Sequence, residues 1–357
     1  MRKLSRREWV AGAAFASQAA AQEAVRLPRK VRLAVIGLEG HIGEMIEQMD
    51  RLPDVELGAI QDRDPKLRQQ VAGGRHAANA RQYGDWHELL AREELDMAGI
   101  CGSNGERAEI IVACARRKLH IVAEKPLAIT TGELERVKQA VAENGIRLTM
   151  LIEMRFTPQY RALKQIVDSG DIGEVAQMAA QKSYKLGERA EWMRHRATYG
   201  GTIPYIAIHM VDLMRFTSGR ELVEAASFQG RVGHPELRDM ENTTATIFRL
   251  DNGGTAALHM DYLRPDTAKS WGDDRLRLAG TRGVAEYQEA TGVTVITGDR
   301  PTRQIHDLPP GGSLFVDFLE SVYHGRPPGL SLADIYRVNE IVLGARDSAD
   351  RGAIVRL

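Results

Sequence analysis

Short apolar runs alternate with longer helix-like stretches from residue 31 to residue 152, and few folds are compatible with this alternation. The runs cover residues 31–37, 55–60, 95–101, 120–123 and 147–152. Buried strands that enter turns have this pattern, and strands that alternate with helices of this length form parallel βαβ units. The first part of the chain is therefore predicted to be a Rossmann-type α/β domain with a parallel sheet, in which Tyr83 lies in a short connection.

The pattern changes after Glu153, where successive extended segments replace the alternation. Asp251-Asn252-Gly253-Gly254 is a hairpin signal between two of these segments. Strands joined by hairpins predict a C-terminal α/β domain with a large, mostly antiparallel open sheet. A chain of 357 residues is also long for one domain. We therefore expect a signal or disordered segment over 1–27, a dinucleotide-binding domain over 28–152 and a substrate and oligomerisation domain over 153–357, whose last helix packs back on the N-terminal domain.

The first predicted strand leads into the turn Gly37-Leu38-Glu39-Gly40-His41-Ile42-Gly43. In dinucleotide-binding folds, a glycine-rich turn at this place holds the pyrophosphate with free backbone N–H groups. The spacing here is G-x-x-G-x-x-G, so Glu39 stands where the second glycine is expected, or one residue has been inserted. A carboxylate beside a pyrophosphate is repulsive unless it turns outward.

An acidic residue, Asp62, follows the second predicted strand. An acid at this point can bind a ribose 2′-hydroxyl, which favours NAD. Arg63 could instead meet a 2′-phosphate, so NADP stays possible, and the alternative for Asp62 is a helix cap ahead of Pro65. The residues expected at the cofactor are Gly37, Leu38, Glu39, Gly40, His41, Ile42, Gly43, Asp62, Arg63, Ser103, Asn104, Glu124, Lys125 and Pro126.

The tripeptide Glu124-Lys125-Pro126 ends the apolar run at residues 120–123. A lysine there lies at the carboxyl edge of a parallel sheet, where ligands bind in open α/β sheets. The proline keeps the preceding residue extended, so the lysine cannot shift into a helix. An ammonium in such a crevice suits the polarisation of a substrate hydroxyl or carbonyl. The alternative is a surface lysine at the end of a strand.

A predicted helix in the second half carries three polar side chains on one face. Gly200-Gly201 precedes it, and Thr202 is expected to be its N-cap. Tyr205, His209 and Asp212 are four and three residues apart and therefore share a face. One ring nitrogen of His209 can face a substrate while Asp212 or another acceptor orients the other. The alternative is a structural histidine.

Charge and apolar content argue against two classes of partner. The chain has 48 Lys+Arg and 48 Asp+Glu residues, a net charge of +0, and so lacks the basic footprint of a nucleic-acid-binding protein. No run of about 18 apolar residues occurs, so no membrane span is predicted.

Cys101 and Cys114 lie in apolar surroundings, which indicates buried thiols, and no metal site is expected.

The first residues have the layout of an export signal. Ser5-Arg6-Arg7-Glu8-Trp9-Val10 is similar to the twin-arginine pattern, and a weakly apolar run and small residues follow it. Export to the periplasm or the outside, after folding and cofactor loading, is the expectation. The alternative is a disordered, alanine-rich tail on a cytoplasmic protein.

Four motifs follow one another along the chain. They are Glu124-Lys125-Pro126, Arg155-Phe156-x-Pro158, Gly170-x-Ile172-Gly173-Glu174-Val175, and Gly200-Gly201 leading to His209-x-x-Asp212. In this order they resemble the glucose–fructose oxidoreductase/inositol dehydrogenase/MocA (Gfo/Idh/MocA) family. The resemblance implies NAD(P)-dependent redox chemistry on sugars, cyclitols or related polyols, and a homo-oligomer that forms through the C-terminal sheet. It also implies that Lys125 is the active-site lysine and His209 the catalytic histidine.

Two positions depart from the family pattern. The family commonly has an aspartate four residues before the histidine, where this chain has Tyr205. It often has a histidine three residues after Asn104, where this chain has Arg107. These changes leave the substrate and the direction of the reaction open.

Together these features predict hydride transfer from a substrate carbinol to NAD. Lys125, Tyr205 and His209 are the expected catalytic residues, and Asp212 is expected to support His209. The expected substrate ligands are Lys125, Arg155, Arg196, Tyr205 and His209. Two alternatives remain, namely a glycoside-cleaving or isomerising enzyme that retains its NAD, and a non-catalytic sugar-binding protein whose cofactor turn is disabled by Glu39.

Overall fold

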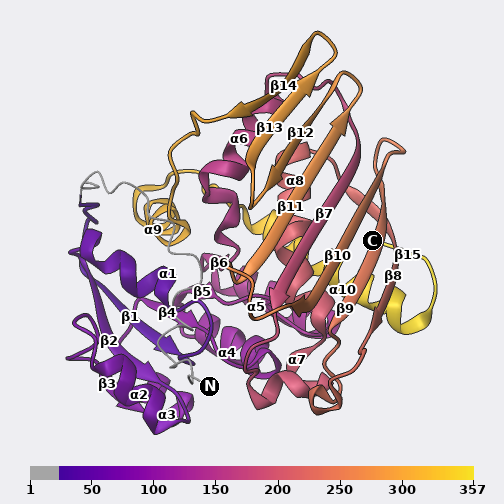
Figure 1. Cartoon of the computed structure of the whole chain (residues 1–357). Helices are drawn as coiled ribbons and strands as arrows, with labels where there is room; N and C mark the ends of the chain where they lie inside the picture. Colours follow the sequence, from indigo (N-terminus) through magenta and orange to yellow (C-terminus); the bar gives the residue numbers. More distant parts are fainter. Residues whose placement is uncertain (1–23) are drawn as a thin grey trace.

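The structure of the chain is a computed structural model that describes residues 24–357 (Figure 1). The twin-arginine-like motif lies outside the described residues. None of the helices in residues 24–357 has the length and hydrophobicity needed to span a bilayer. Cys101 and Cys114 are buried free thiols, as predicted.

The first sheet has six parallel strands in the order β3-β2-β1-β4-β5-β6. The predicted Rossmann-type α/β fold is confirmed. Tyr83 belongs to a third strand rather than to a connection. The sequence did not predict this strand, because three residues are too few to show an alternating pattern. The strands are β1 (Val31–Ile36), β2 (Val55–Gln61), β3 (Arg81–Tyr83), β4 (Met97–Ile100), β5 (His120–Ala123) and β6 (Leu148–Met150).

Helices and polar caps connect these strands. Asp64 and Asp85 accept backbone N–H groups at the starts of their helices, and Thr130 forms a capping box with Glu133. These local caps explain why the helices begin where the sequence places them. The helices are α1 (Gly43–Ile46), a 3₁₀ helix (Glu47–Arg51), α2 (Pro65–Ala72), α3 (Trp86–Arg92), α4 (Asn104–Arg116) and α5 (Thr131–Asn144).

The second sheet has nine strands in the order β14-β13-β12-β11-β7-β10-β9-β8-β15. Only β7 and β10 pair in parallel, so the prediction of a mostly antiparallel sheet is confirmed. The predicted hairpin joins β9 to β10. The strands are β7 (Val175–Lys185), β8 (Leu222–Gly230), β9 (Thr243–Leu250), β10 (Thr255–Arg264), β11 (Gly272–Gly280), β12 (Gly283–Gln288), β13 (Gly292–Thr297), β14 (Arg300–Ile305) and β15 (Val355–Arg356).

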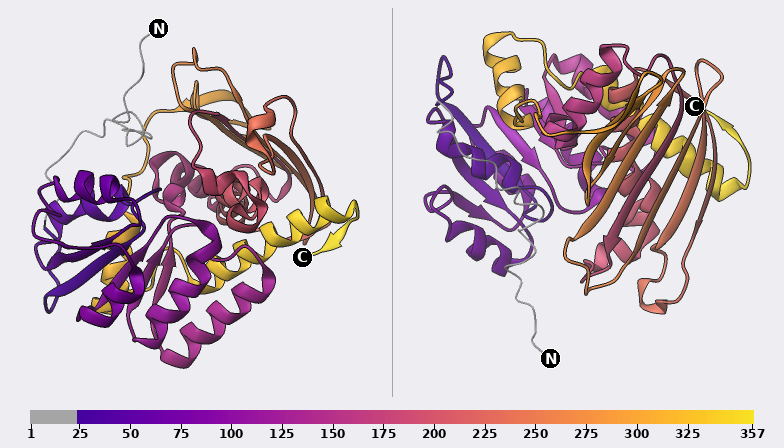
Figure 2. Two further views of the ribbon diagram at one scale, coloured as in Figure 1. Left: turned by 90° about the horizontal axis from the view of Figure 1, so that it is seen from below. Right: turned by 45° about the horizontal axis from the view of Figure 1, so that its top comes forward.

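Helices α6 (Pro158–Asp168), α8 (Ile208–Ser218) and α10 (Leu332–Arg351) cover one face of the second sheet, on the side of the first domain, as Figure 2 shows. Helix α10 also contacts the first half, because Asn339 accepts a hydrogen bond from the Leu127 N–H at 2.9 Å. The helices are a 3₁₀ helix (Glu153–Phe156), α6 (Pro158–Asp168), a 3₁₀ helix (Glu191–Arg194), α7 (Arg196–Tyr199), a π-helix (Ile203–Ala207), α8 (Ile208–Ser218), a 3₁₀ helix (Pro235–Leu237), α9 (Leu314–His324) and α10 (Leu332–Arg351).

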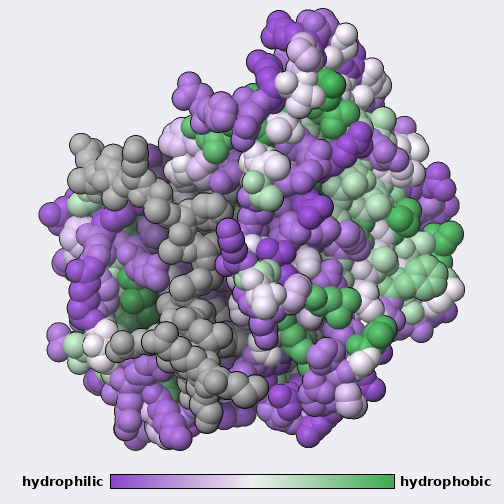
Figure 3. Space-filling model, in the orientation of Figure 1, coloured by the Kyte–Doolittle hydropathy of each residue, from purple (hydrophilic) through white to green (hydrophobic). Residues whose placement is uncertain are grey.

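The opposite face of the second sheet carries no helix among the described residues (Figure 1). Side chains alternate along β9 between buried and exposed, as expected for a sheet with one covered face. Phe228 and Ile247 are 76% and 54% exposed on this side. Figure 3 shows hydrophobic residues gathered on the side of the molecule that carries β8, β9 and β10.

Candidate active site

Lys125 is buried where β5 ends at the carboxyl edge of the first sheet. Its exposed fraction is 2%, which excludes the alternative of a surface lysine. The Nζ group donates a hydrogen bond to the Tyr205 carbonyl at 3.1 Å and lies 3.5 Å from the centroid of the Tyr205 ring. A cation over an aromatic face is stabilised by the ring's negative centre. The second half of the chain therefore supports the lysine that the first half supplies.

The charge state of Lys125 is set by burial and by its neighbours. Burial lowers the pKa of the Lys125 ammonium to about 8, Glu124 opposes this shift, and Arg107 reinforces it. The Lys125 ammonium lies 4.0 Å from Oε1 of Glu124. The lysine is thus mostly protonated at neutral pH and loses its charge in mildly alkaline solution.

Glu124 links Lys125 to the glycine turn. Its Oε2 accepts hydrogen bonds from the His41 N–H at 2.9 Å and from Nδ1 of the same residue at 2.6 Å. Burial opposes ionisation of Glu124, but His41, Lys125 and Arg107 hold the pKa of its carboxyl well below the usual range. The charge of Glu124 in turn raises the pKa of His41 to about 9. This pair is therefore ionic at neutral pH.

Gly40 is required where Glu124 meets the turn. Its φ is +79°, and a Cβ at this position would lie 2.7 Å from Oε2 of Glu124. Any larger residue would therefore be strained and would also displace the carboxylate.

His209 lies on α8 and is 4% exposed. Its ring centroid is 6.3 Å from that of His41, and its Nδ1 has no hydrogen-bond partner within residues 24–357. Burial lowers the pKa of His209 well below the ordinary histidine value, and the nearby charges of Lys125 and Lys182 lower it further. The imidazole is thus neutral at physiological pH and can accept a proton.

The helix that carries His209 begins differently from the prediction. Thr202 has αR geometry and no side-chain cap bond, so the N-cap prediction is wrong. Its N–H and Oγ1 instead donate to Glu241, at 3.0 and 2.7 Å. A π-helix over Ile203–Ala207 then places Tyr205 beside Lys125. Burial raises the pKa of Tyr205 well above its ordinary value, so the phenol stays protonated.

Asp212 does not orient His209, which corrects the expectation from spacing. Both of its oxygens accept hydrogen bonds from Arg155, one of them from Nε at 3.0 Å. Arg155 also donates to the Gly329 carbonyl at 3.0 Å and pairs with Asp334. The Arg155 guanidinium is therefore held by protein groups rather than directed to a substrate. The expectation failed because helical spacing does not show which partner a charged side chain meets.

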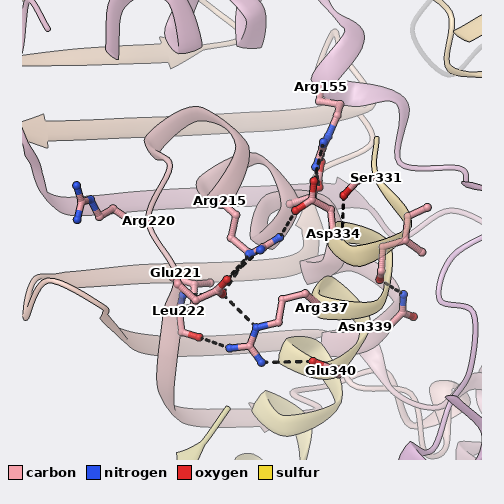
Figure 4. Close-up of polar contacts among 12 residues, drawn as sticks. Arg155, Arg215, Arg220, Glu221, Leu222, Ser331, Asp334, Arg337, Asn339 and Glu340 are labelled. Carbon is pink, nitrogen blue, oxygen red and sulfur yellow. Dashed lines mark hydrogen bonds and ion pairs between the residues drawn. The ribbon is translucent and has the colours of Figure 1, made fainter. Parts of the chain in front are cut away.

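An ion network continues from Arg155 towards α10 (Figure 4). Asp334 also pairs with Arg215 at 3.0 Å, and Arg215 binds Glu221 at 2.9 Å. Arg337 on α10 reaches the same Glu221 at 3.3 Å. The network ties the segment after β6 to α8 and α10, and so fixes the helix on which His209 lies.

Replacing Arg155 with methionine is expected to destabilise the protein. The change leaves the buried Asp212 without its cation, and breaking a buried pair in this way costs about 3–5 kcal/mol. The free energy of unfolding from urea titrations would measure the loss. A double variant, Arg155→Met with Asp212→Leu, should recover most of it, and equal stability of the single variant and the wild type would contradict the assignment.

Arg196, the other arginine expected at the substrate, is also engaged by protein groups. Its guanidinium pairs with Glu241 and with Asp350, each at 2.5 Å. Within the described part of the chain, no contact joins it to Lys125 or His209.

Glu39 is turned away from the amides of the glycine turn. Its Oε2 accepts a hydrogen bond from Nε1 of Trp192 at 2.7 Å, which joins the turn to the second half of the chain. Burial raises the pKa of Glu39, and the Trp192 bond opposes this shift. The Trp192 ring also lies 6.0 Å from that of Tyr205. The outward orientation that a pyrophosphate site requires is therefore present.

Two amides of the turn are bound by carboxylates of the protein. The Leu38 N–H donates to Oδ2 of Asp62 at 2.9 Å, and the His41 N–H is bound by Glu124. Asp64 rather than Asp62 caps α2, so the helix-cap alternative for Asp62 is excluded. The remaining turn residues Gly37, Gly40, Ile42 and Gly43 lie between β1 and α1.

Asn104 and Arg107 join α4 to the neighbouring elements. Asn104 donates to the Tyr199 carbonyl at 2.8 Å, and Arg107 donates to Asn104 at 2.8 Å and to the Pro126 carbonyl at 2.7 Å. Ser103 directly precedes α4. In the position where the family often has histidine, Arg107 thus fixes the backbone beside Lys125.

Sequence reasoning missed Glu153 as a member of this group. Its charge raises the pKa of Lys125 and of His41, so it lies within electrostatic range of both. The available signal was its position, because it closely follows β6, which pairs with β5. Lys182 on β7 is buried as well and pairs with Asp274 at 2.7 Å.

Two family models match the chain. One is described as the oxidoreductase family, NAD-binding Rossmann fold, and matches residues 31–151; the other is the GFO/IDH/MocA C-terminal domain, at residues 160–286. Myo-inositol 2-dehydrogenase of Thermotoga maritima is 25% identical over 317 residues, which are 85% of this chain and 92% of that protein. A solved structure from Thermotoga maritima has 30% identity and a TM-score of 0.85, over 92% of this chain and all 100% of that one. Levoglucosan dehydrogenase in complex with NADH shares the fold, with a TM-score of 0.80 at 19% identity over 92% of this chain and 99% of that one.

Proposed function

This chain belongs to the GFO/IDH/MocA oxidoreductase family, and on that premise we propose that it oxidises a hydroxyl group of a sugar, cyclitol or related polyol. It is an oxidoreductase with an NAD-binding Rossmann domain. The observation that carries the substrate proposal is the convergence of a buried, protonated Lys125 with a buried, neutral His209. One group can stabilise an alkoxide and the other can accept the hydroxyl proton.

The residues of the turn fit a dinucleotide. The turn lies between β1 and α1 of the NAD-binding Rossmann domain, where such folds hold the pyrophosphate, and the Glu39 carboxylate is bound by Trp192. Asp62 would hold the ribose. Arg63 forms an ion pair with Glu106 at 2.6 Å, so it is engaged away from a 2′-phosphate, which favours NAD over NADP. Ser103, Asn104 and Pro126 are further residues that would hold the cofactor.

Bound NAD supplies the hydride acceptor. His209 takes the hydroxyl proton on a ring nitrogen, because burial and then the neighbouring positive charges lower the pKa of the imidazole and keep it neutral before the reaction. Lys125 stabilises the negative charge that develops on the substrate oxygen. Tyr205 holds Lys125 in place through its ring and carbonyl, so its role is to position the lysine rather than to relay a proton.

A second candidate function is redox-neutral glycoside cleavage or isomerisation with retained NAD. The Glu39–Trp192 hydrogen bond favours it, because this contact bridges from the cofactor turn to the second half of the chain. The two candidates share one site and differ in whether NADH accumulates. The alternative of a cofactor turn disabled by Glu39 is not supported, because Trp192 binds that carboxylate.

Protein purified without added nucleotide should release NAD on denaturation if the cofactor is retained. The released nucleotide would be identified by its mass and counted against protein. Stoichiometric NADH during turnover of a polyol would support the dehydrogenase, while turnover without net NADH would support the second candidate. Failure of the protein to bind either NAD or NADP would contradict both.

Location, assembly and domain division complete the proposal. The twin-arginine-like motif supports export to the periplasm or the outside. The uncovered face of the second sheet, with Phe228 and Ile247 exposed, supports a homo-oligomer formed through this sheet. The proposed domains are 28–152 and 153–357.

A further inference from the structure

Glu153 is a carboxylate in the active-site group that lacks a partner. Its Oε2 is inaccessible to solvent and has no hydrogen-bond partner among residues 24–357. A buried polar atom without a partner is costly, and native proteins rarely tolerate one without a reason. Glu153 as a whole is only half-buried, so its carboxylate can turn to accept a hydrogen bond from a ligand beside it.

The position of Glu153 places it at the reacting end of the first sheet. Met150, the last residue of β6, pairs with Ala123 of β5, directly before Glu124 and Lys125. Glu153 follows three residues later. The next residue, Met154, contacts Nζ of Lys182 through its sulfur at 3.3 Å. Glu153 therefore lies within electrostatic range of Lys125 and His41, next in the chain to a residue that contacts Lys182.

The other charged groups here are already matched. Glu124 binds His41 at 2.6 Å, and Lys182 binds Asp274 at 2.7 Å. Asp274 also has a buried oxygen without a partner, Oδ1, but its other oxygen binds Lys182, whereas no hydrogen bond or ion pair engages Glu153 among the described residues. Nδ1 of His209 is likewise buried without a hydrogen-bond partner among the described residues. The Glu153 carboxylate and the His209 imidazole, each with an unmatched atom, thus both lie near the Lys125 ammonium.

We propose that Glu153 is a specificity-determining residue, whose carboxylate accepts a hydrogen bond from a second donor group of the substrate. This rests on the proposed function, in which Lys125 and His209 hold the reacting hydroxyl. The substrate class is therefore a polyol with a further hydroxyl or amino group near the reacting carbon. Simple secondary alcohols gain nothing from Glu153, and a carboxylate at that position would be repelled.

Steady-state kinetics of Glu153→Ala and Glu153→Gln would test the proposal. The probes are myo-inositol, D-glucose, D-glucosamine, D-glucuronate and cyclohexanol. We expect Glu153→Ala to raise KM about tenfold or more for the polyol that the enzyme oxidises. KM for NAD should not change, and the glutamine variant, which keeps an acceptor of the same shape, should recover part of the loss for neutral polyols. Glu143→Gln, on the exposed side of α5, is the matched control.

The outcomes separate the two proposals. Turnover of no polyol by the wild type would overturn the proposed function. Polyol turnover with an unchanged KM in Glu153→Ala, or with equal rises of KM for polyol and NAD, would overturn the role of Glu153 alone. A larger loss for D-glucosamine than for D-glucose in Glu153→Gln would support an amino donor, and equal losses would support a hydroxyl donor. Melting temperatures would confirm that both variants fold.

Discussion

Replacing Lys125 with methionine is expected to lower kcat by about 10²- to 10³-fold, the effect of removing one positioned donor from a developing oxyanion. Methionine nearly fills the same volume, so the loss reports the missing charge rather than a cavity. In the wild type, kcat/KM should fall as pH rises through about 8, because the Lys125 ammonium then loses its proton. Stopped-flow absorbance of NADH between pH 6 and 10 would measure both.

The matched control is Lys66→Met, which removes an exposed lysine from α2. It should leave kcat and the pH profile unchanged. A Lys125→Met enzyme with normal turnover, or one that keeps the alkaline limb near pH 8, would contradict the assignment. Arginine at position 125 offers a further check, because it should move the alkaline limb to higher pH.

Replacing His209 with asparagine is expected to lower kcat by about 10²- to 10⁴-fold, the range that a positioned general base contributes. Burial and the nearby lysines lower the pKa of His209. Protonation therefore removes the base only well below the ordinary histidine range. The wild-type activity should persist on the acid side to a pH below about 6.5 and then fall.

The asparagine variant should lose this acid limb, and its remaining activity should depend on pH mainly through Lys125. The half-buried His195, which pairs with Glu191, is replaced with asparagine as the control and should leave the profile intact. A His209→Asn enzyme that keeps the acid limb would show that another group accepts the proton. Binding of NADH, followed by fluorescence, should be equal in both variants if the fold is intact.

Much of the fold could be read from local patterns. The first sheet followed from the alternation of strands and helices, and the second from the hairpin that joins β9 to β10. Tyr83 was missed as a strand because β3 has three residues. The N-cap prediction at Thr202 was wrong because a π-helix replaces the expected first turn and Thr202 donates to the distant Glu241 instead.

The site was predicted only in part. Lys125 and His209 were found because a sheet edge and a glycine-led helix have local signals, and the structure brings them together through Tyr205. The partners of the charged groups were not found. Asp212 binds Arg155, 57 residues away in the chain, and Glu39 binds Trp192, 153 residues away.

By itself, the sequence determined the strand and helix order, the glycine turn and the residues at the sheet edge, because period, capping and turn chemistry act over a few neighbouring residues. Only the tertiary structure decided which ions pair, which way Glu39 faces, and that Glu153 is left without a partner. Those outcomes depend on burial and on side chains that are distant in the chain, so no local pattern encodes them.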